Sequence, residues 1–401
     1  MNVSKIREDF PILQANKKLI YFDNACTTLK PKQVIDALNE YYVKYPACAV
    51  RSLHKLGRAA TEAYERSRVR IAKFLNAKPD EIIFTKNATE GLNLVARTLK
   101  LNKGDAVLAT DKEHNSSLLP WLLAVKERGI KRIVVPSKPD NSFDMTAFEK
   151  AIGTYKPKLV TAIHASNLDG YTIPAREVIK RAHDAGALVV LDGAQSVPHQ
   201  SIDVRKLDVD FLAFSGHKML GPTGIGVLYV KRSVMDKLEP FMLGGETVTN
   251  STYTSYDLEK PPARFEAGIQ DYSGAMGLAA AAEYLEKIGL ENIAKHETEL
   301  NTRLTKGMQD IHGFDLVGPV KPELRNGIMS FNIAGVDPHT IALMLDELSG
   351  IAIRSGQHCV HSWFNAHNIK GTARASLYLY NTQEEVDTFI ETMKKIVKAV
   401  K

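Results

Sequence analysis

The stretch Leu212-Ala213-Phe214-Ser215-Gly216-His217-Lys218-Met219-Leu220-Gly221-Pro222-Thr223-Gly224-Ile225-Gly226 decides how this chain can fold. The apolar run Phe211–Phe214 predicts a buried strand, and Val227–Val230 predicts a second one after the glycines. A lysine held between two buried strands is costly unless its amine is used. Removal from water lowers a lysine pKa, and a neutral amine can bond covalently to an aldehyde. We therefore expect Lys218 to carry a carbonyl cofactor.

The composition is that of an ordinary soluble enzyme. With 401 residues, 44% of them hydrophobic and 24% charged, the chain can form a large domain and a smaller one. The net charge of +6 comes without a basic block interleaved with aromatic residues, so we expect no nucleic-acid partner. The first residues show no secretory signal, and no apolar run reaches membrane-spanning length. We expect a cytoplasmic protein that does not bind membranes.

The three cysteines are too few and too scattered for a disulfide framework. The chain also lacks a CxxC pair, which argues against a cysteine-based zinc or iron–sulfur site. We expect no metal site.

Short apolar segments alternate with amphipathic helical segments through the first two thirds of the chain. Before the Lys218 stretch we expect strands at 81–85, 106–110, 132–135, 158–164 and 187–192, with helices between them. Earlier segments predict an irregular arm over 1–30 and helices over 31–41 and 58–75. Such alternation is typical of a mostly parallel sheet, whose ligands bind at the carboxyl ends of the strands.

The pattern changes after Val230. A long loop over 244–270 leads to helices at 276–288 and 292–308, and the last hundred residues alternate again. We predict an α/β fold: a large domain with a mostly parallel, seven-stranded type of sheet flanked by helices, plus a smaller α+β domain. The predicted large domain covers 17–260, and the small domain combines 1–16 with 261–401 and is partly discontinuous.

Polar residues follow the predicted strands and form a candidate site. A helix start at Ala88 and Thr89 suits either a phosphate or a simple helix cap. An acidic residue at the end of a buried strand needs a positive partner, and a protonated pyridine nitrogen would provide one. The full set is Ala88, Thr89, His114, Asn167, Asp192, Gln195, Ser215, His217 and Lys218. Pyridoxal phosphate needs such groups, whereas the P-loop and GxGxxG motifs of nucleotide sites are absent.

These residues resemble a known family. The segments around Asp192 and Lys218 look like the class V aminotransferase superfamily of fold-type I pyridoxal-phosphate enzymes. The match is closest to the group II, sulfur-mobilisation type of cysteine desulfurase. Further similar motifs are Tyr21–Ala25, Thr89–Gly91, Glu113–His114, Ser166–Asn167, Gly244–Glu246, Phe265–Gly268 and Arg374–Ser376.

The resemblance implies a role for each site residue. Lys218 would hold the cofactor through its amine and move protons, and His114 would stack on the pyridine ring and assist acid–base steps. Asp192 would pair with the ring nitrogen and Gln195 with the ring hydroxyl. The phosphate would be held by Thr89, Ser215, His217 and the backbone N–H of Ala88. The substrate carboxylate would be bound by Asn167, Arg374 and Arg354.

Cys359 stands where the family keeps its nucleophilic cysteine. The resemblance implies that its thiolate attacks the sulfur of L-cysteine, forms a persulfide and releases L-alanine. For Cys26 and Cys48 we favour buried structural roles. A metal site formed by His358, Cys359, His361 and His367 is a weaker alternative, since their spacing fits no known ligand pattern.

The chain departs from the family pattern at several positions. Ile269 replaces a threonine that would reach the phosphate of a neighbouring subunit, and Val50 and Gln357 each replace a histidine. Asp169 introduces a charge where the family is usually apolar. These changes bear on substrate and activity more than on fold.

The resemblance implies a homodimeric cysteine desulfurase that passes sulfur to an acceptor or scaffold protein. The sulfur would then serve iron–sulfur cluster or thio-cofactor synthesis. Two alternatives stay open at this point. One is a selenocysteine lyase or cysteine sulfinate desulfinase with the same cofactor. The other is a weakly active sulfur-delivery or scaffold subunit.

Overall fold

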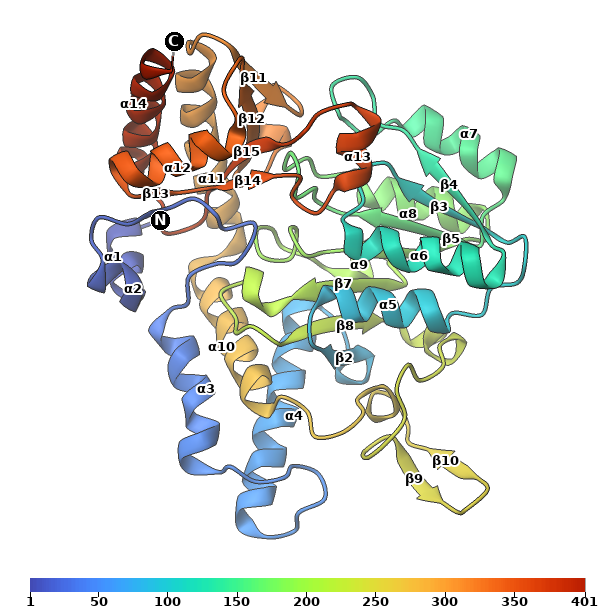
Figure 1. The fold of residues 1–401 in the computed structure, drawn as a ribbon. Coiled ribbons are helices and arrows are strands. Elements are labelled where there is room, and N and C mark those ends of the chain that lie inside the picture. Colours follow the sequence, from blue (N-terminus) through green and yellow to red (C-terminus); the bar gives the residue numbers. More distant parts are fainter. Residues whose placement is uncertain (401) are drawn as a thin grey trace.

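A seven-stranded sheet forms the centre of the protein (Figure 1). The computed structural model describes residues 1–400. The strand order is β2-β8-β7-β6-β5-β3-β4, and only β8 runs against its neighbours. The strands are β2 (Ile82–Thr85), β3 (Ala106–Thr110), β4 (Lys131–Val135), β5 (Leu159–Ile163), β6 (Leu188–Asp192), β7 (Phe211–Ser215) and β8 (Gly226–Val230). The predicted α/β fold with a mostly parallel sheet is confirmed.

The central strands are apolar throughout because both faces of the sheet are covered. Leu212 and Phe214 of β7 point into one hydrophobic core, whereas Phe211 and Ala213 point into another. This is the alternation of side chains expected for a strand. The flanking helices include α5 (Ala88–Thr98), α6 (Asn115–Arg128), α7 (Met145–Tyr155), α8 (Ala175–Asp184) and the short α9 (Val204–Leu207).

Three long helices extend from the sheet. α10 (Tyr272–Ile288) packs against both α3 (Lys32–Lys44) and α4 (Lys55–Leu75), which lie far from it in sequence. Small residues along α10 permit close packing: a Cβ added at Gly277 would lie 3.6 Å from the Val34 carbonyl oxygen of α3 and only 2.6 Å from the Pro222 ring, which follows the Lys218 turn. Figure 1 shows α3 and α4 projecting from the body, with the hairpin of β9 (Val248–Ser251) and β10 (Tyr256–Leu258) on the same side.

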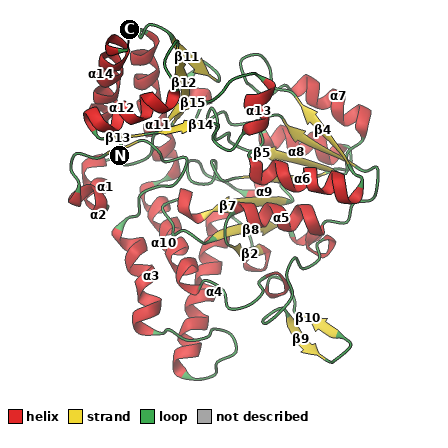
Figure 2. Ribbon diagram, in the orientation of Figure 1, coloured by secondary structure: helices red, strands yellow, loops and turns green. Residues whose placement is uncertain are grey.

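A smaller antiparallel sheet lies at the other end of the molecule (Figure 2). Its strand order is β11-β12-β15-β14, and a two-stranded pair of β1 and β13 lies nearby. These strands are β1 (Ile20–Tyr21), β11 (Phe314–Val317), β12 (Ile328–Ile333), β13 (Ile351–Ala352), β14 (Arg354–Gly356) and β15 (Thr372–Ser376). The helices of this part are α1 (Val3–Glu8), α2 (Pro11–Ala15), α11 (Leu290–Gln309), α12 (Pro338–Ser349), α13 (His361–Ala366) and α14 (Gln383–Ala399).

Several elements differ from the sequence-based expectation. The arm over 1–30 contains α1 and α2, and the predicted loop over 244–270 contains the β9–β10 hairpin. β11 and α13 were not predicted either. Helices of five or six residues are too short to show a period, and the hairpin strands are mostly exposed, so neither carries an apolar pattern.

Two further expectations concern the chain as a whole. The division into 17–260 and 1–16 plus 261–401 stays a prediction. Across residues 1–400, no helix combines the length and apolar character needed to cross a membrane.

Candidate active site

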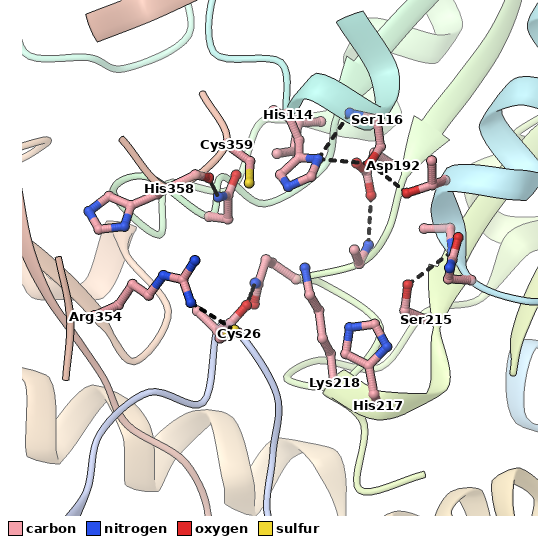
Figure 3. A pocket seen from close by; sticks show the side chains of 18 of the residues that line it. Cys26, His114, Ser116, Asp192, Ser215, His217, Lys218, Arg354, His358 and Cys359 are labelled. Atoms are coloured by element: carbon pink, nitrogen blue, oxygen red, sulfur yellow. Dashed lines mark hydrogen bonds between the residues drawn. The ribbon is translucent and has the colours of Figure 1, made fainter. Parts of the chain in front are cut away.

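A cavity of about 210 Å³ holds every site residue predicted from the sequence. Its lining combines the carboxyl ends of central strands, the first turns of α5 and α6, and the edge of the smaller sheet (Figure 3). The predicted residues that line it are Ala88, Thr89, His114, Asn167, Asp192, Gln195, Ser215, His217, Lys218, Arg354, Cys359 and Arg374. The placement of a ligand site at the strand ends follows the general rule for such sheets.

Lys218 is presented by a tight turn at the end of β7. A Cβ added at Gly216 would lie 2.9 Å from the carbonyl oxygen of Ile225, so only glycine fits there. The backbone N–H of Thr28 and the amine of Lys30 donate to the His217 carbonyl, at 3.0 and 2.8 Å. Loss of water around the Lys218 amine lowers its pKa, and Asp192 partly opposes that shift. The amine is therefore fixed in place and more readily neutral than an exposed lysine.

Asp192 forms the floor of the cavity. Its side chain is buried, and one carboxyl oxygen accepts a hydrogen bond of 3.0 Å from the backbone N–H of Ala194. Burial raises the pKa of this carboxyl, while the Ala194 bond and the charge of Lys218 lower it. A buried carboxylate in this position would be stabilised by a cation placed above it.

His114 caps the N-terminus of α6 and faces the cavity. Its Nδ1 accepts from the backbone N–H of Ser116 at 3.1 Å, which puts the proton of the neutral ring on Nε2. Burial, followed by the charges of Lys218 and Arg374, lowers the His114 pKa to about 3. The ring is therefore neutral at physiological pH, and its exchangeable proton is held at the nitrogen away from the helix.

The start of α5 forms an anion cradle beside Lys218. Asn87 caps the helix by accepting from the Glu90 N–H at 3.1 Å. A Cβ added at Gly226 would lie 2.5 Å from the Cα of Asn87, so glycine allows the helix start to approach β8 closely. Free N–H groups and the positive helix dipole favour a phosphate there.

Hydroxyl groups complete the cradle. The Ala88 N–H, expected to face the phosphate, donates instead to the Ser215 hydroxyl at 2.9 Å, and Thr89 bonds Ser116 at 2.6 Å. The structure therefore offers hydroxyls at Thr89, Ser116 and Ser215. The Ala88 N–H orients one of them.

Arg374 and Asn167 form the opposite wall. One Arg374 Nη donates to the Asn167 carbonyl at 2.9 Å, and the other lies 3.5 Å from an Asp23 carboxyl oxygen. The Asn167 amide donates to the His358 carbonyl at 2.6 Å. The Nε of Arg374 and the side-chain oxygen of Asn167 are buried and have no partner. A buried guanidinium with a free N–H is suited to a carboxylate.

Cys359 lies on an exposed loop between β14 and α13. His358 and Cys359 have φ angles of 48° and 58°, in the left-handed region that non-glycine residues rarely adopt. The Asn115 N–H holds the loop by donating to the Cys359 carbonyl at 2.8 Å. Strain at a ligand-facing loop is characteristic of functional sites.

Cys26 corrects one sequence-based expectation. It is half buried and lines the cavity, where an Arg354 Nη donates to its sulfur at 3.5 Å. Cys48 is half buried too, but lies outside the cavity lining. The prediction that Cys26 is buried is wrong, because the bonds from Gln195 and to Ser376 hold the preceding Ala25 at the wall of the cavity, which Cys26 also lines. The position of Cys26 directly after the motif Tyr21–Ala25 was a usable signal.

His358 and Ser116 also line the cavity and were not predicted to bind cofactor or substrate. The His358 ring nitrogen Nε2 lies 2.8 Å from the Thr372 hydroxyl, and its other nitrogen has no partner. In residues 1–400 no group of three or more His, Cys, Asp or Glu side chains is arranged to hold a metal. The alternative metal site at His358, Cys359, His361 and His367 is therefore not formed.

One departure from the family pattern is compensated locally, and two others lie away from the cavity. The charge of Asp169 is neutralised by Lys112, whose amine lies 2.7 Å from the buried carboxylate. Ile269 and Val50 are both exposed, at 71% and 58%. Neither touches the cavity.

The cavity fits pyridoxal phosphate on its own geometry. The carboxylate of Asp192 is buried and accepts from the Ala194 N–H, and the side-chain oxygen of Gln195 is buried without a partner. The amine of Lys218 and the α5 cradle lie in the same cavity. A pyridine ring with a hydroxyl, an aldehyde and a phosphate would satisfy these groups together.

Comparisons with known proteins agree on one family. A family model described as Aminotransferase class-V matches residues 20–389. A probable cysteine desulfurase of Pyrococcus abyssi is 43% identical over 99% of this chain and 98% of its own. The apo structure of a cysteine desulfurase from Thermococcus onnurineus shares 42% identity, with a TM-score of 0.95 over 99% of this chain and 98% of that one. The cysteine desulfurase CsdA of Escherichia coli shares 31%, with a TM-score of 0.92 over 100% and 99%.

Proposed function

This chain belongs to the class V aminotransferase family, and on that premise we propose that it is a pyridoxal-phosphate-dependent cysteine desulfurase. It converts L-cysteine to L-alanine and leaves the sulfur as a persulfide on Cys359. The observation that carries this proposal is the placement of one exposed, strained cysteine in the same cavity as Lys218 and Arg374.

The cofactor, when bound, withdraws electrons from the substrate α-carbon. The other tasks belong to side chains of this protein. Lys218 would hold the cofactor and would move a proton at the substrate α-carbon, while Asp192 would keep the ring nitrogen protonated. Gln195 meets the ring hydroxyl, and Thr89, Ser215 and His217 hold the phosphate. His114 is neutral and carries its proton on Nε2. It would stack on the cofactor ring, and its Nε2 proton can be donated to a group that leaves or enters the site.

Substrate orientation comes from the opposite wall. The free Nε of Arg374 donates to the substrate carboxylate, and the Asn167 Nδ2, which already donates one hydrogen to the His358 carbonyl, offers its second hydrogen. The nearby Arg354 adds a second positive charge. The substrate sulfur then faces the Cys359 loop, where a thiolate can attack it. The persulfide forms as the carbon–sulfur bond breaks, and the proton needed to complete alanine is supplied at the carbon.

The test is to supply L-cysteine to the purified holoenzyme and measure alanine together with persulfide on Cys359. We expect both products in the wild type. We expect the Cys359→Ala variant to lose desulfuration by about a hundredfold or more, because the nucleophile is gone. Cys48→Ala is the matched control. Sulfide release by Cys359→Ala at the wild-type rate would contradict the persulfide route.

Substrate choice is tested in the same assay with selenocysteine and cysteine sulfinate. We expect L-cysteine turnover to depend most strongly on Cys359, because only that reaction needs a thiolate to take up sulfur. Turnover of the other two substrates that exceeds cysteine turnover and is indifferent to Cys359→Ala would favour a lyase or desulfinase. A protein that lacks the yellow colour of bound cofactor would favour a delivery or scaffold subunit.

The proposal extends to a homodimer that passes sulfur to an acceptor protein. Exposed apolar side chains occur at the ends of α3 and α4 and on the 241–270 segment, with Val43, Leu53 and Ile269 exposed by 79%, 81% and 71%. Such residues are typical of a surface that another subunit covers. Light scattering of the purified protein tests the mass.

The acceptor would receive sulfur for iron–sulfur cluster or thio-cofactor synthesis, in the cytoplasm.

A further inference from the structure

The cavity contains a second thiol that the reaction above does not use. Cys26 lies on the segment between β1 and α3 and is half buried. Figure 3 shows it beside Arg354, on the side of the cavity from which Lys218 enters. The Arg354 guanidinium donates to its sulfur at 3.5 Å. A guanidinium that donates to sulfur interacts most strongly with the thiolate, which is the reactive form of a cysteine.

The backbone on either side fixes this thiol in the cavity. The Gln195 amide donates to the Ala25 carbonyl at 2.7 Å, and the Ala25 N–H donates to the Ser376 hydroxyl at 2.9 Å. On the other side, the Thr27 hydroxyl donates to the His217 carbonyl at 3.1 Å. The segment that carries Cys26 is therefore fixed on both sides, and the Thr27 hydroxyl ties it to the Lys218 turn.

The surroundings of Cys26 suit an anionic sulfur species. The Arg354 guanidinium donates to the Cys26 sulfur, and Lys218 and Arg374 line the same cavity. The Arg374 Nε, on a side chain more than nine-tenths buried, is a hydrogen-bond donor without a partner in this cavity. Two thiols, the Lys218 amine and the guanidiniums of Arg354 and Arg374 thus share a space of about 210 Å³.

We propose that Cys26 is a second sulfur acceptor that takes the outer sulfur atom from Cys359. This inference rests on the persulfide function proposed above. The Cys26 thiolate attacks the outer sulfur of the Cys359 persulfide and forms a new sulfur–sulfur bond, while the bond to Cys359 breaks. Cys359 leaves as a thiolate, and the proton of the persulfide stays on the transferred sulfur. The exchange is neutral in electrons and needs no added oxidant or reductant.

The transfer frees Cys359 for another turnover before any acceptor arrives. Without an acceptor or a reductant, the wild type therefore forms about twice as much alanine per active site in its first burst as the Cys26→Ala variant. Cys48→Ala is the matched control because it removes a half-buried thiol outside the cavity. We expect its burst to equal that of the wild type.

The direct test maps persulfides after a single addition of L-cysteine to the holoenzyme, followed by alkylation, trypsin and mass spectrometry. The three cysteines fall in separate tryptic peptides, 19–32, 45–51 and 355–370. We expect the mass of one added sulfur on the peptides of Cys26 and Cys359 but not on that of Cys48. In Cys359→Ala we expect no added sulfur on Cys26, because the atom arrives through Cys359.

Each of the other possible results of the peptide map leads to one conclusion about the relay or the proposed function. Persulfide on Cys359 alone overturns the relay and leaves the proposed function standing, whereas persulfide on neither Cys359 nor Cys26 overturns the proposed function itself. A disulfide between Cys26 and Cys359, sulfur on Cys26 in Cys359→Ala, or equal labelling of Cys48 also overturns the relay. If Cys26→Ala fails to fold, the wild-type peptide map alone decides.

Discussion

The Lys218 turn and the Cys359 loop face each other across one cavity but are held in opposite ways. The turn ends a central strand, and the His217 carbonyl within it accepts from Thr28 and Lys30. The Cys359 loop is exposed, has two left-handed residues and is fastened by single bonds from Asn115 and Asn167. A group that holds a cofactor benefits from rigidity, whereas a group that carries sulfur outward must reach solvent.

The largest effect is expected on the rigid side. Lys218→Ala removes the amine that holds the cofactor and moves the proton, so we expect alanine formation to fall by about a thousandfold or more. The visible absorbance of bound cofactor should weaken as well, and both are measured on the purified variant. Lys206→Ala, with an 85% exposed side chain, is the control. Activity within tenfold of the wild type would contradict the role of Lys218.

An intermediate effect is expected from pH on the side of the central sheet. Burial lowers the pKa of His164, which follows β5 on the rigid side, to about 4. Between that value and about 6.5 the unfolded chain binds more protons, so stability is lost as the pH falls through this window. Between pH 7 and pH 5 the free energy of unfolding falls, and we expect this fall to be about 2 kcal/mol smaller in His164→Leu than in the wild type.

Denaturant unfolding at the two pH values measures this difference. His361→Gln, on the exposed side, is the matched control. His114 and His217, with pKa values lowered to about 3 and about 4, account for further acid sensitivity of the same region. An unchanged pH dependence in His164→Leu would show that this ring is not kept neutral by burial.

The smallest effect is expected at the fastening of the Cys359 loop. Asn167→Ala removes the hydrogen bond to the His358 carbonyl, and we expect this loss to destabilise the closed loop by about 1 kcal/mol. We expect hydrogen exchange at the Asn115 N–H, which donates to Cys359, to accelerate roughly fivefold. Asn292→Ala, on α11, removes an exposed amide and serves as the control. Protection equal to the wild type would mean that the loop is held by other contacts.

The sequence predicted much of this molecule because its strongest signals are local. The continuous apolar strands that flank Lys218, and the polar residues after each strand, indicated the sheet and its ligand edge. The family resemblance is confirmed by the class V match and the cysteine desulfurase relatives. The β9–β10 hairpin, β11 and α13 were not predicted, because short or exposed elements show no hydrophobic periodicity.

Contacts between segments that are distant in the chain could not be predicted from the sequence. Nothing local indicates that Lys112 neutralises Asp169, or that Arg354 donates to Cys26 across the cavity. The residue types at the strand ends by themselves determined the fold class, the cofactor and the set of candidate site residues, because a buried lysine, a buried acid and an open helix start each demand a partner. Only the tertiary structure decided which partners meet. Packing brings Ala25, Ser376 and Gln195 together, and that contact turns Cys26 toward the site.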